Sequence, residues 1–182
     1  KNIYQLSLRL GISFAATCWA LFEHDILSRQ AASEFTDEQG LVKRIKNSIT
    51  PGEVDRNPWA NVWHLTMGDD GYRLKASEKD VFVAELEENS ASGYVWEISD
   101  GNNQINILFD SSDFDEKYGS ESNRQIVFQV TSPSEYSIAF SHRRPWNDDV
   151  IEKIAIFIDN RGREVTGLPR DRKQRSLSEA QA

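Results

Sequence analysis

The sequence has little cysteine and little histidine, and each shortage excludes a class of protein. Cys18 is the only cysteine, so no internal disulfide framework can hold the fold together. The three histidines form no set with the spacing of a zinc site. The acidic stretch 110–116 lacks the glycine and the terminal glutamate of a calcium loop. We therefore expect neither a metal nor a cofactor.

Long apolar runs and positive charge are also scarce. No apolar run approaches the roughly 20 residues of a membrane-spanning helix, so we expect no membrane span. With 21 Lys and Arg against 29 Asp and Glu, the net charge is −8, which argues against binding to the nucleic-acid backbone. Residues 161–182 carry six basic and three acidic residues and no aromatic residue. We interpret them as a solvated basic tail, with a tether to an anionic surface as the alternative.

The chain is nevertheless rich enough in apolar residues to bury a core. Its hydrophobic content is 38%, with five Trp and nine Phe. From Ser13 to about Ile49 the apolar pattern is helical, because Phe14, Cys18 and Phe22 recur at a spacing of four. Ser13 is the expected N-cap of this first helix.

A second helix is expected to start at Thr36. Thr36 and Gln39 have the spacing of a capping box, and apolar residues follow on one face from Leu41. Gly40 would weaken this helix by about 1 kcal/mol. The stretch 50–59 is rich in turn formers and ends the helical region.

From about Asp69 the apolar period changes from helical to alternating. Five or six short runs rich in β-branched and aromatic residues follow, separated by turn formers and without an intervening helix. This pattern predicts an antiparallel β-sandwich or barrel over residues 72–159, with function carried by the loops.

Three of the predicted loops have distinctive sequences: "NSASGYVW" (89–96), "GSES" (119–122) and "RRPW" (143–146). We expect Trp96 to be a core residue at the start of a strand. Trp146 has two interpretations. It packs onto its own sheet while the arginines pair with Asp148 and Asp149, or it is presented to another protein.

Together and in this order, the three loops resemble those of the chagasin family of cysteine-peptidase inhibitors. That family has an Asn-Pro-Thr-Thr-Gly-Phe/Tyr-x-Trp motif, a Gly-x-Gly-Gly loop and an Arg-Pro-Trp loop. Here the first motif has Ser90, Ala91 and Ser92 in place of Pro-Thr-Thr, the second keeps only Gly119, and the third is complete. These departures predict a different target preference or a weaker affinity than is usual in the family.

The resemblance implies an immunoglobulin-like antiparallel β-sandwich after a helical N-terminal segment, an α+β fold. It implies a reversible, non-covalent inhibitor that blocks the cleft of a papain-like cysteine peptidase, in a secreted, periplasmic or lysosomal-type compartment. The residues that it places in the three inhibitory loops are Asn89, Ser90, Ala91, Ser92, Gly93 and Tyr94; Gly119, Ser120, Glu121 and Ser122; Arg143, Arg144, Pro145 and Trp146.

By this interpretation the chain has three parts: a helical segment (1–68), a chagasin-like sandwich (69–160) and the basic tail (161–182). A degenerate first copy of the sandwich is the alternative for the first part. Two other functions remain open. One is a protein-binding or assembly module on the same sandwich. The other is a cysteine hydrolase, because Cys18-Trp19-Ala20 resembles the sequence around the nucleophile of papain-like peptidases. We favour a buried, non-catalytic Cys18.

Overall fold

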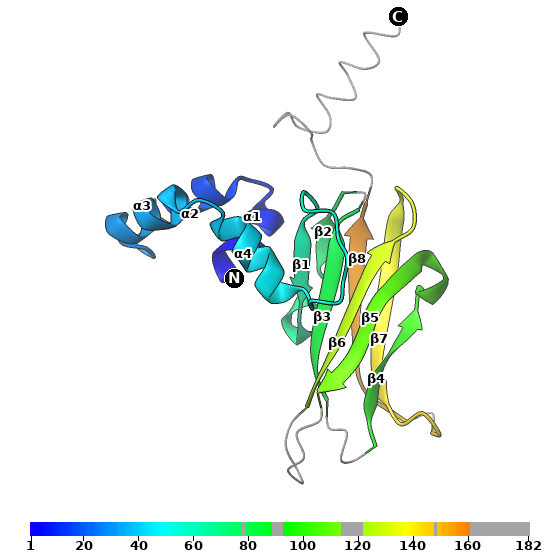
Figure 1. Ribbon diagram of the computed structural model, residues 1–182. Coiled ribbons are helices and arrows are strands. Elements are labelled where there is room, and N and C mark those ends of the chain that lie inside the picture. The colour runs from blue at the N-terminus through cyan, green and yellow to red at the C-terminus, as the bar shows by residue number, and fades with distance from the viewer. Residues whose placement is uncertain (78, 89–92, 114–121, 148, 161–182) are drawn as a thin grey trace, which may run out of the picture.

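The computed structural model describes residues 1–77, 79–88, 93–113, 122–147 and 149–160. Helices come first and a sandwich of two β-sheets follows (Figure 1). The helices are α1 (Asn2–Leu10), α2 (Phe14–Glu23), α3 (Arg29–Asp37) and α4 (Leu41–Ile49). The strands are β1 (Val62–Leu65), β2 (Arg73–Lys75), β3 (Val81–Glu88), β4 (Val95–Asp100), β5 (Ile105–Asp113), β6 (Ser122–Val130), β7 (Glu135–Arg143) and β8 (Val150–Asp159).

The helix boundaries confirm one sequence prediction and correct another. Ser13 is the N-cap of α2, and its side chain accepts a hydrogen bond from the Ala16 amide. The capping box at Thr36 was a wrong prediction. Thr36 lies inside α3 and donates to the Ala32 carbonyl, while Gly40, at φ 74°, is the N-cap of α4. A left-handed glycine ends the preceding turn here without the strain that a side chain would add.

The sandwich consists of a β1-β3-β6-β5 sheet and a β2-β8-β7-β4 sheet. The predicted antiparallel sandwich is confirmed for the long strands, since β3, β5 and β6 pair antiparallel, as do β4, β7 and β8. The short edge strands differ, because β1 pairs with β3 and β2 with β8 in parallel. The sheets are therefore mixed.

Aromatic side chains fill the space between the two sheets. Trp63 and Phe82 are stacked at 6.4 Å between ring centroids, and Phe82 and Phe128 at 5.2 Å. Phe128 in turn meets Phe140 of the other sheet at 6.1 Å. These rings and Trp96 are fully buried, so the prediction of Trp96 as a core residue is confirmed. Stacked rings add geometric preference to the burial of apolar area.

Helix α1 covers the open edge of strand β1 with side chains rather than with another strand. The Tyr4 hydroxyl accepts from the Val62 amide at 3.1 Å, and Gln5 Nε2 donates to the Val62 carbonyl at 2.8 Å. Gln5 Oε1 accepts from the His64 amide at 2.9 Å, and Arg9 donates to the His64 carbonyl at 3.2 Å. An edge strand with unpaired backbone groups invites pairing with another chain, so α1 closes this edge of the sheet.

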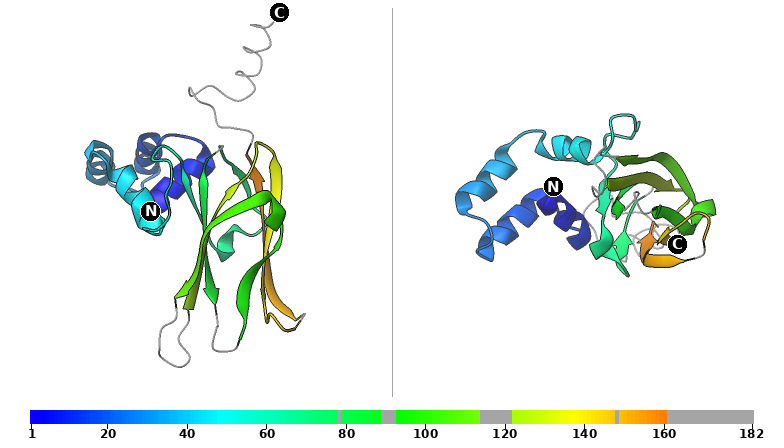
Figure 2. Two further views of the ribbon diagram at one scale, coloured as in Figure 1. Left: turned by 45° about the vertical axis from the view of Figure 1, so that its right-hand side comes forward. Right: turned by 90° about the horizontal axis from the view of Figure 1, so that it is seen from below.

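The helical segment is thus joined to the sandwich at its β1 side (Figures 1 and 2). Tyr4, Leu8 and Ile49 belong to the same buried cluster as the sandwich core. Strand β1 lies within residues 1–68, before the predicted domain boundary at residue 69. The three-part division of the chain stays a prediction.

Among the described residues, no single helix is long and apolar enough to cross a membrane. Helices α1 and α2 together would reach that length and composition, but the chain bends by 100° between them.

Replacing Gln5 by Ala should destabilise the fold by about 1–3 kcal/mol, because it leaves the Val62 carbonyl and the His64 amide without their partner on the edge of β1. Urea unfolding measures this change, and size-exclusion chromatography reports any new pairing of the exposed edge. Gln30→Ala is the matched control, since Gln30 is exposed on α3 and contacts Glu34 of its own helix. Equal stability of the two variants would contradict the role given to Gln5.

Candidate functional site

The three loops singled out in the sequence arise at one end of the sandwich. The first joins β3 to β4, the second β5 to β6, and the third β7 to β8. The register aligns their ends, because Glu88 pairs with Ser122, and Arg143 pairs with both Val95 and Val150. This end lies at the bottom of Figure 1 and of the left view of Figure 2.

Trp146 of the third loop lies against the first loop. Its side chain is not buried under its own sheet, since the residue is 73% exposed. A Cβ at Gly93 would stand 2.6 Å from the Trp146 ring, and Gly93 has a φ of +77°. A glycine is therefore needed at position 93 for two reasons: its backbone is left-handed, and the Trp146 indole occupies the space that a side chain would fill. The interpretation of Trp146 as tucked onto its own sheet is wrong.

A row of stacked groups connects the third loop to the core. The Arg144 guanidinium lies over the Tyr94 ring at 4.5 Å from its centroid. Tyr94 meets the His142 ring edge-on at 5.8 Å, and His142 stacks on Trp96 at 4.8 Å. Each of these contacts joins β4 or its preceding loop to β7 or its following loop. A cation held over an aromatic face keeps its planar donors oriented while it stays partly hydrated.

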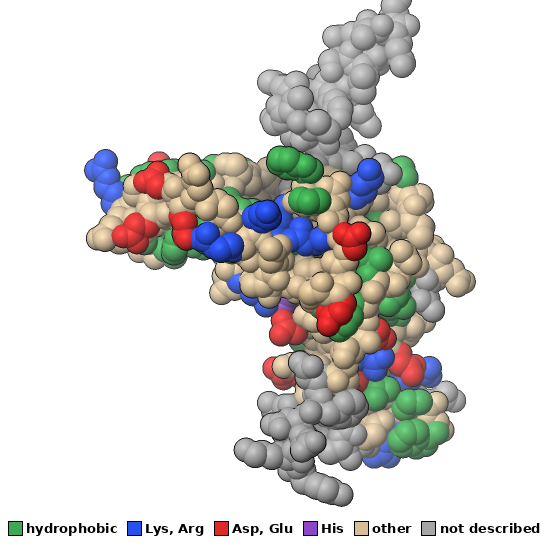
Figure 3. Space-filling model, viewed as in Figure 1, with side chains coloured by type: hydrophobic (Ala, Val, Ile, Leu, Met, Phe, Trp, Pro, Cys, Tyr) green, Lys and Arg blue, Asp and Glu red, His purple; other side chains and the backbone are tan. Residues whose placement is uncertain are grey.

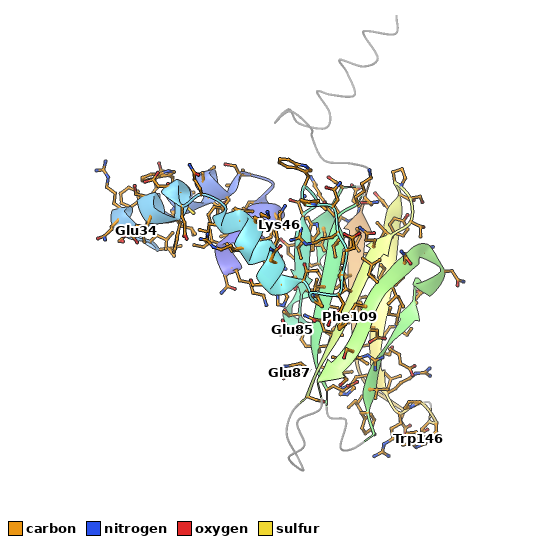
Figure 4. The ribbon with its side chains drawn as sticks, viewed as in Figure 1. Glu34, Lys46, Glu85, Glu87, Phe109 and Trp146 are labelled. Atoms are coloured by element: carbon orange, nitrogen blue, oxygen red, sulfur yellow. The ribbon has the colours of Figure 1, made fainter. Side chains whose placement is uncertain are left out.

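Trp146 and Arg144 therefore form a projecting, amphipathic surface. Figure 4 shows Trp146 at the tip of the β7–β8 turn, and Figure 3 shows hydrophobic and basic side chains together at this end. Arg143, by contrast, is held by Glu97 of β4 at 2.8 Å. An exposed Trp beside a half-buried Arg on a loop is typical of the residues that dominate protein–protein binding energy.

A buried carboxylate lies beneath the first and second loops. Glu88 is the last residue of β3, and its side chain is fully buried. The carboxylate accepts hydrogen bonds from the Trp96 amide at 2.8 Å and from the Ser112 hydroxyl at 2.6 Å. Arg124 lies 3.6 Å away. The Glu88 carbonyl accepts from the Ser122 hydroxyl at 2.9 Å.

Arg124 is fixed mainly by a different carboxylate. It forms two parallel hydrogen bonds to Asp110, of 2.8 and 2.9 Å. Bonding to Asp110 raises the pKa of the Arg124 guanidinium above its usual value, and Glu88 adds to this effect. The arginine therefore remains a permanent positive charge between β5 and β6, close to the buried Glu88.

The predicted site residues fall into two groups. Gly93, Tyr94, Ser122 and the whole Arg143–Trp146 stretch lie together at the loop end of the sandwich. The others lie outside the described residues: Asn89, Ser90, Ala91 and Ser92 of the first loop, and Gly119, Ser120 and Glu121 of the second. Their inhibitory roles stay predictions, as do those of the described loop residues.

Sequence reasoning missed two residues that support these loops. His142, within the strand that leads to the third loop, is buried, and its Nε2 has no hydrogen-bond partner among the described residues. Glu88 directly precedes the first loop motif and continues the inward-facing series Phe82, Ala84 and Leu86 at a spacing of two. That alternation was the available signal for its burial.

Two other features lie elsewhere. A pocket of about 200 Å³ is lined by residues such as Arg73, Glu135 and Phe157, at the end of β7 opposite the loops. Cys18 is fully buried in α2, and burial raises the pKa of its thiol. The preferred interpretation of Cys18 as a buried apolar residue is thus confirmed.

Gly93→Ala should displace the Trp146 ring, because the new methyl group would overlap it and the backbone would be strained by about 1–2 kcal/mol. The Trp146 indole N–H resonance in a ¹H–¹⁵N spectrum, assigned by its loss in Trp146→Phe, should shift markedly. Gly52→Ala is the control, because a Cβ at Gly52 meets nothing within 4 Å. An unmoved resonance in Gly93→Ala would refute the packing of the two loops.

A family profile and several solved structures are similar to parts of this chain. Residues 75–158 match the sequence profile of the Chagasin family peptidase inhibitor I42. The cysteine protease inhibitor EhICP2 from Entamoeba histolytica is similar in structure, with a TM-score of 0.52 and 21% identity over 58% of this chain and 100% of that chain. Amebosin gives 0.46 and 18% over 55% and 97%. PbICP-C, solved in complex with falcipain-2, gives 0.37 and 16% over 60% and 95%.

At these identities, the likeness to EhICP2 shows a shared fold. No curated protein sequence matches the chain significantly. The profile match covers the strands from β3 to β7, most of β8 and the three loops between them. Residues 75–158 therefore match the profile of the chagasin family of cysteine-peptidase inhibitors, the family that the loop sequences resemble, and the β-sandwich shares its fold with EhICP2.

Proposed function

We propose that this protein is a reversible, non-covalent inhibitor of papain-like cysteine peptidases and that it blocks their active-site cleft with its three adjacent loops. The observation that carries the proposal is the exposed Trp146, held against Gly93 of the first loop at the end of a chagasin-family sandwich. The cysteine protease inhibitor EhICP2 has the same fold, which supports the proposal.

The side chains of the third loop are held in place before any peptidase binds. Trp146 is fixed by the first loop, and Arg144 is fixed by Tyr94, so little side-chain freedom is left to lose on binding. The conformational entropy that the inhibitor loses on binding is therefore small, which favours a higher affinity. Trp146 would pack on an apolar or aromatic surface beside the cleft, while Arg144 would offer planar donors to carbonyl or carboxylate oxygens.

The first loop would enter the cleft itself. By the family resemblance, Ala91 and Ser92 would lie nearest the cysteine of the peptidase, and the second loop would lie along one side of the groove. This mode needs shape and hydrogen bonding but no nucleophile from the inhibitor. The inhibition would therefore be competitive and fully reversible.

A catalytic role for Cys18 has no comparable support. A nucleophilic thiolate needs an exposed, electropositive surrounding that lowers its pKa. Cys18 is instead fully buried, with the pKa of its thiol raised by that burial. We therefore assign no peptidase activity to the helical segment.

The purified protein should inhibit papain or a cathepsin-like enzyme at sub-micromolar concentration, and Trp146→Ala should raise the inhibition constant about a hundredfold. That loss corresponds to about 2–3 kcal/mol, as expected for a tryptophan that anchors an interface. Steady-state inhibition with a fluorogenic peptide substrate measures both values. Lengthening the loop at 89–93 should also weaken inhibition.

Trp59→Ala provides the matched control. Trp59 is 89% exposed and precedes β1, whose start pairs with the start of β3, at the end opposite the loops. Its removal should leave the inhibition constant unchanged. Full activity of a panel of papain-like enzymes with the unsubstituted protein present at micromolar concentration would refute the proposed function.

A further inference from the structure

We propose that Glu88 is a positioning residue that fixes the strand ends beside the first and second loops relative to each other, and that tight inhibition requires it. The second half of this inference rests on the proposed function, whereas the first half concerns the free protein alone. Glu88 belongs to neither loop motif, and its side chain is fully buried, so it would act only through the groups that it holds.

The first loop is held from both of its ends. Glu88 is the residue at which β3 ends, and the amide that its carboxylate binds belongs to Trp96, near the start of β4. The indole Nε1 of Trp96 donates to the neighbouring Glu87 carbonyl at 2.7 Å. These two bonds cross from one sheet to the other, since β3 and β4 lie in different sheets. They set the distance that the first loop must span.

The second loop is held by the same residue. Ser112, near the end of β5, donates to one oxygen of the carboxylate. Ser122, the first residue of β6, donates to the Glu88 carbonyl, and Arg124 of β6 lies 3.6 Å from the carboxylate. The connection from β5 to β6 therefore starts and ends at side chains bound to Glu88. One residue thus touches both ends of two loops.

The chemistry explains why a carboxylate is suited to this position. Core burial alone would favour an apolar residue here, because the inward-facing series before it is Phe82, Ala84 and Leu86. A buried carboxylate is costly unless its oxygens accept several hydrogen bonds or lie near a cation. Glu88 has two strong donors and Arg124 beside it. Donors from two different sheets oblige the chain to keep one arrangement of the loop ends.

Glu88→Gln tests the inference with little change in volume. The amide nitrogen cannot accept a hydrogen bond, so the variant cannot keep both acceptor contacts as they are, and it loses the charge beside Arg124. Hydrogen exchange of the Trp96 amide and of residues 111–113 and 122–125 should become at least about tenfold faster, as the loss of a charged acceptor implies. Exchange of residues 136–138, at the far end of β7, should not change.

Glu87→Gln is the matched control. Glu87 neighbours Glu88 in the same strand, but its side chain is exposed and points outward (Figure 4), and only its backbone carbonyl binds Trp96. Its substitution should leave both exchange and inhibition unchanged. Against papain, Glu88→Gln should raise the inhibition constant about tenfold, because a loop end that is no longer preorganised must be ordered on binding.

Ser112→Ala gives a second, milder test that does not depend on the folding of Glu88→Gln. It removes the contact to β5 and leaves the bond to the Trp96 amide. Exchange should therefore increase at residues 111–113 and 122–125, while the Trp96 amide stays protected. This local pattern would not arise from a general loss of stability.

Other outcomes would overturn one half of the inference or the proposed function. Unchanged protection of the Trp96 amide in Glu88→Gln, or faster exchange to the same degree throughout the sandwich, would overturn the positioning role. An unchanged inhibition constant with locally faster exchange would overturn the requirement for Glu88 in inhibition. If the unsubstituted protein does not inhibit papain-like enzymes, the proposed function fails, and the exchange pattern still decides the positioning role.

Discussion

The loop end of this protein depends on the buried carboxylate of Glu88, which accepts a hydrogen bond from the Trp96 amide of the other sheet. Two stacked sheets have no backbone hydrogen bonds between them, so apolar packing alone would let them shift relative to each other. A carboxylate with donors on both sheets resists such a shift, because any movement exposes an unsatisfied buried charge. The strand ends from which the loops leave are thereby held at a fixed spacing.

Beside this contact, a row of stacked groups supports the third loop. His142 stacks on Trp96, Tyr94 meets His142, and Arg144 lies over Tyr94. Trp146 then packs where Gly93 leaves room. The same strand start at Trp96 thus supports the first loop by hydrogen bonds and the third by stacking. A rigid base of this kind lets an exposed tryptophan be presented without collapsing onto the core.

The helical segment solves a different physical problem. Strand β1 is an edge, and α1 satisfies its outward amide and carbonyl groups with Tyr4, Gln5 and Arg9. Gln5 and Arg9, four residues apart on the helix, reach the carbonyls of Val62 and His64, two residues apart on the strand. The N-terminal residues are in this way part of the sandwich as well as an extension of it.

Periodicity was sufficient to predict the long elements. The helical spacing around Cys18, the N-cap at Ser13 and the alternating runs after Asp69 all depend on contacts between residues close in sequence. The capping box at Thr36 failed for a related reason. Its side chain bonds back to Ala32 inside α3, and the motif cannot reveal which of two adjacent helices contains it. The parallel pairing of β1 with β3 and of β2 with β8 could not be predicted from the sequence either, because each pair joins strands that are separated by more than a dozen residues.

By itself, the sequence was sufficient to show the resemblance of the sandwich to the chagasin family, because Asn89, Gly93 and Trp96, followed by Arg144-Pro145-Trp146, stand in the order of that family's loop motifs. The sequence also sufficed to predict that Trp96 belongs to the core, because a large aromatic side chain at the start of a strand is usually buried. Only the tertiary structure decided where Trp146 lies and which groups the Glu88 carboxylate binds. Both depend on groups from different strands and loops that meet in space, Trp146 with Gly93 and Glu88 with Trp96 and Ser112, and one-dimensional spacing carries no information about such contacts.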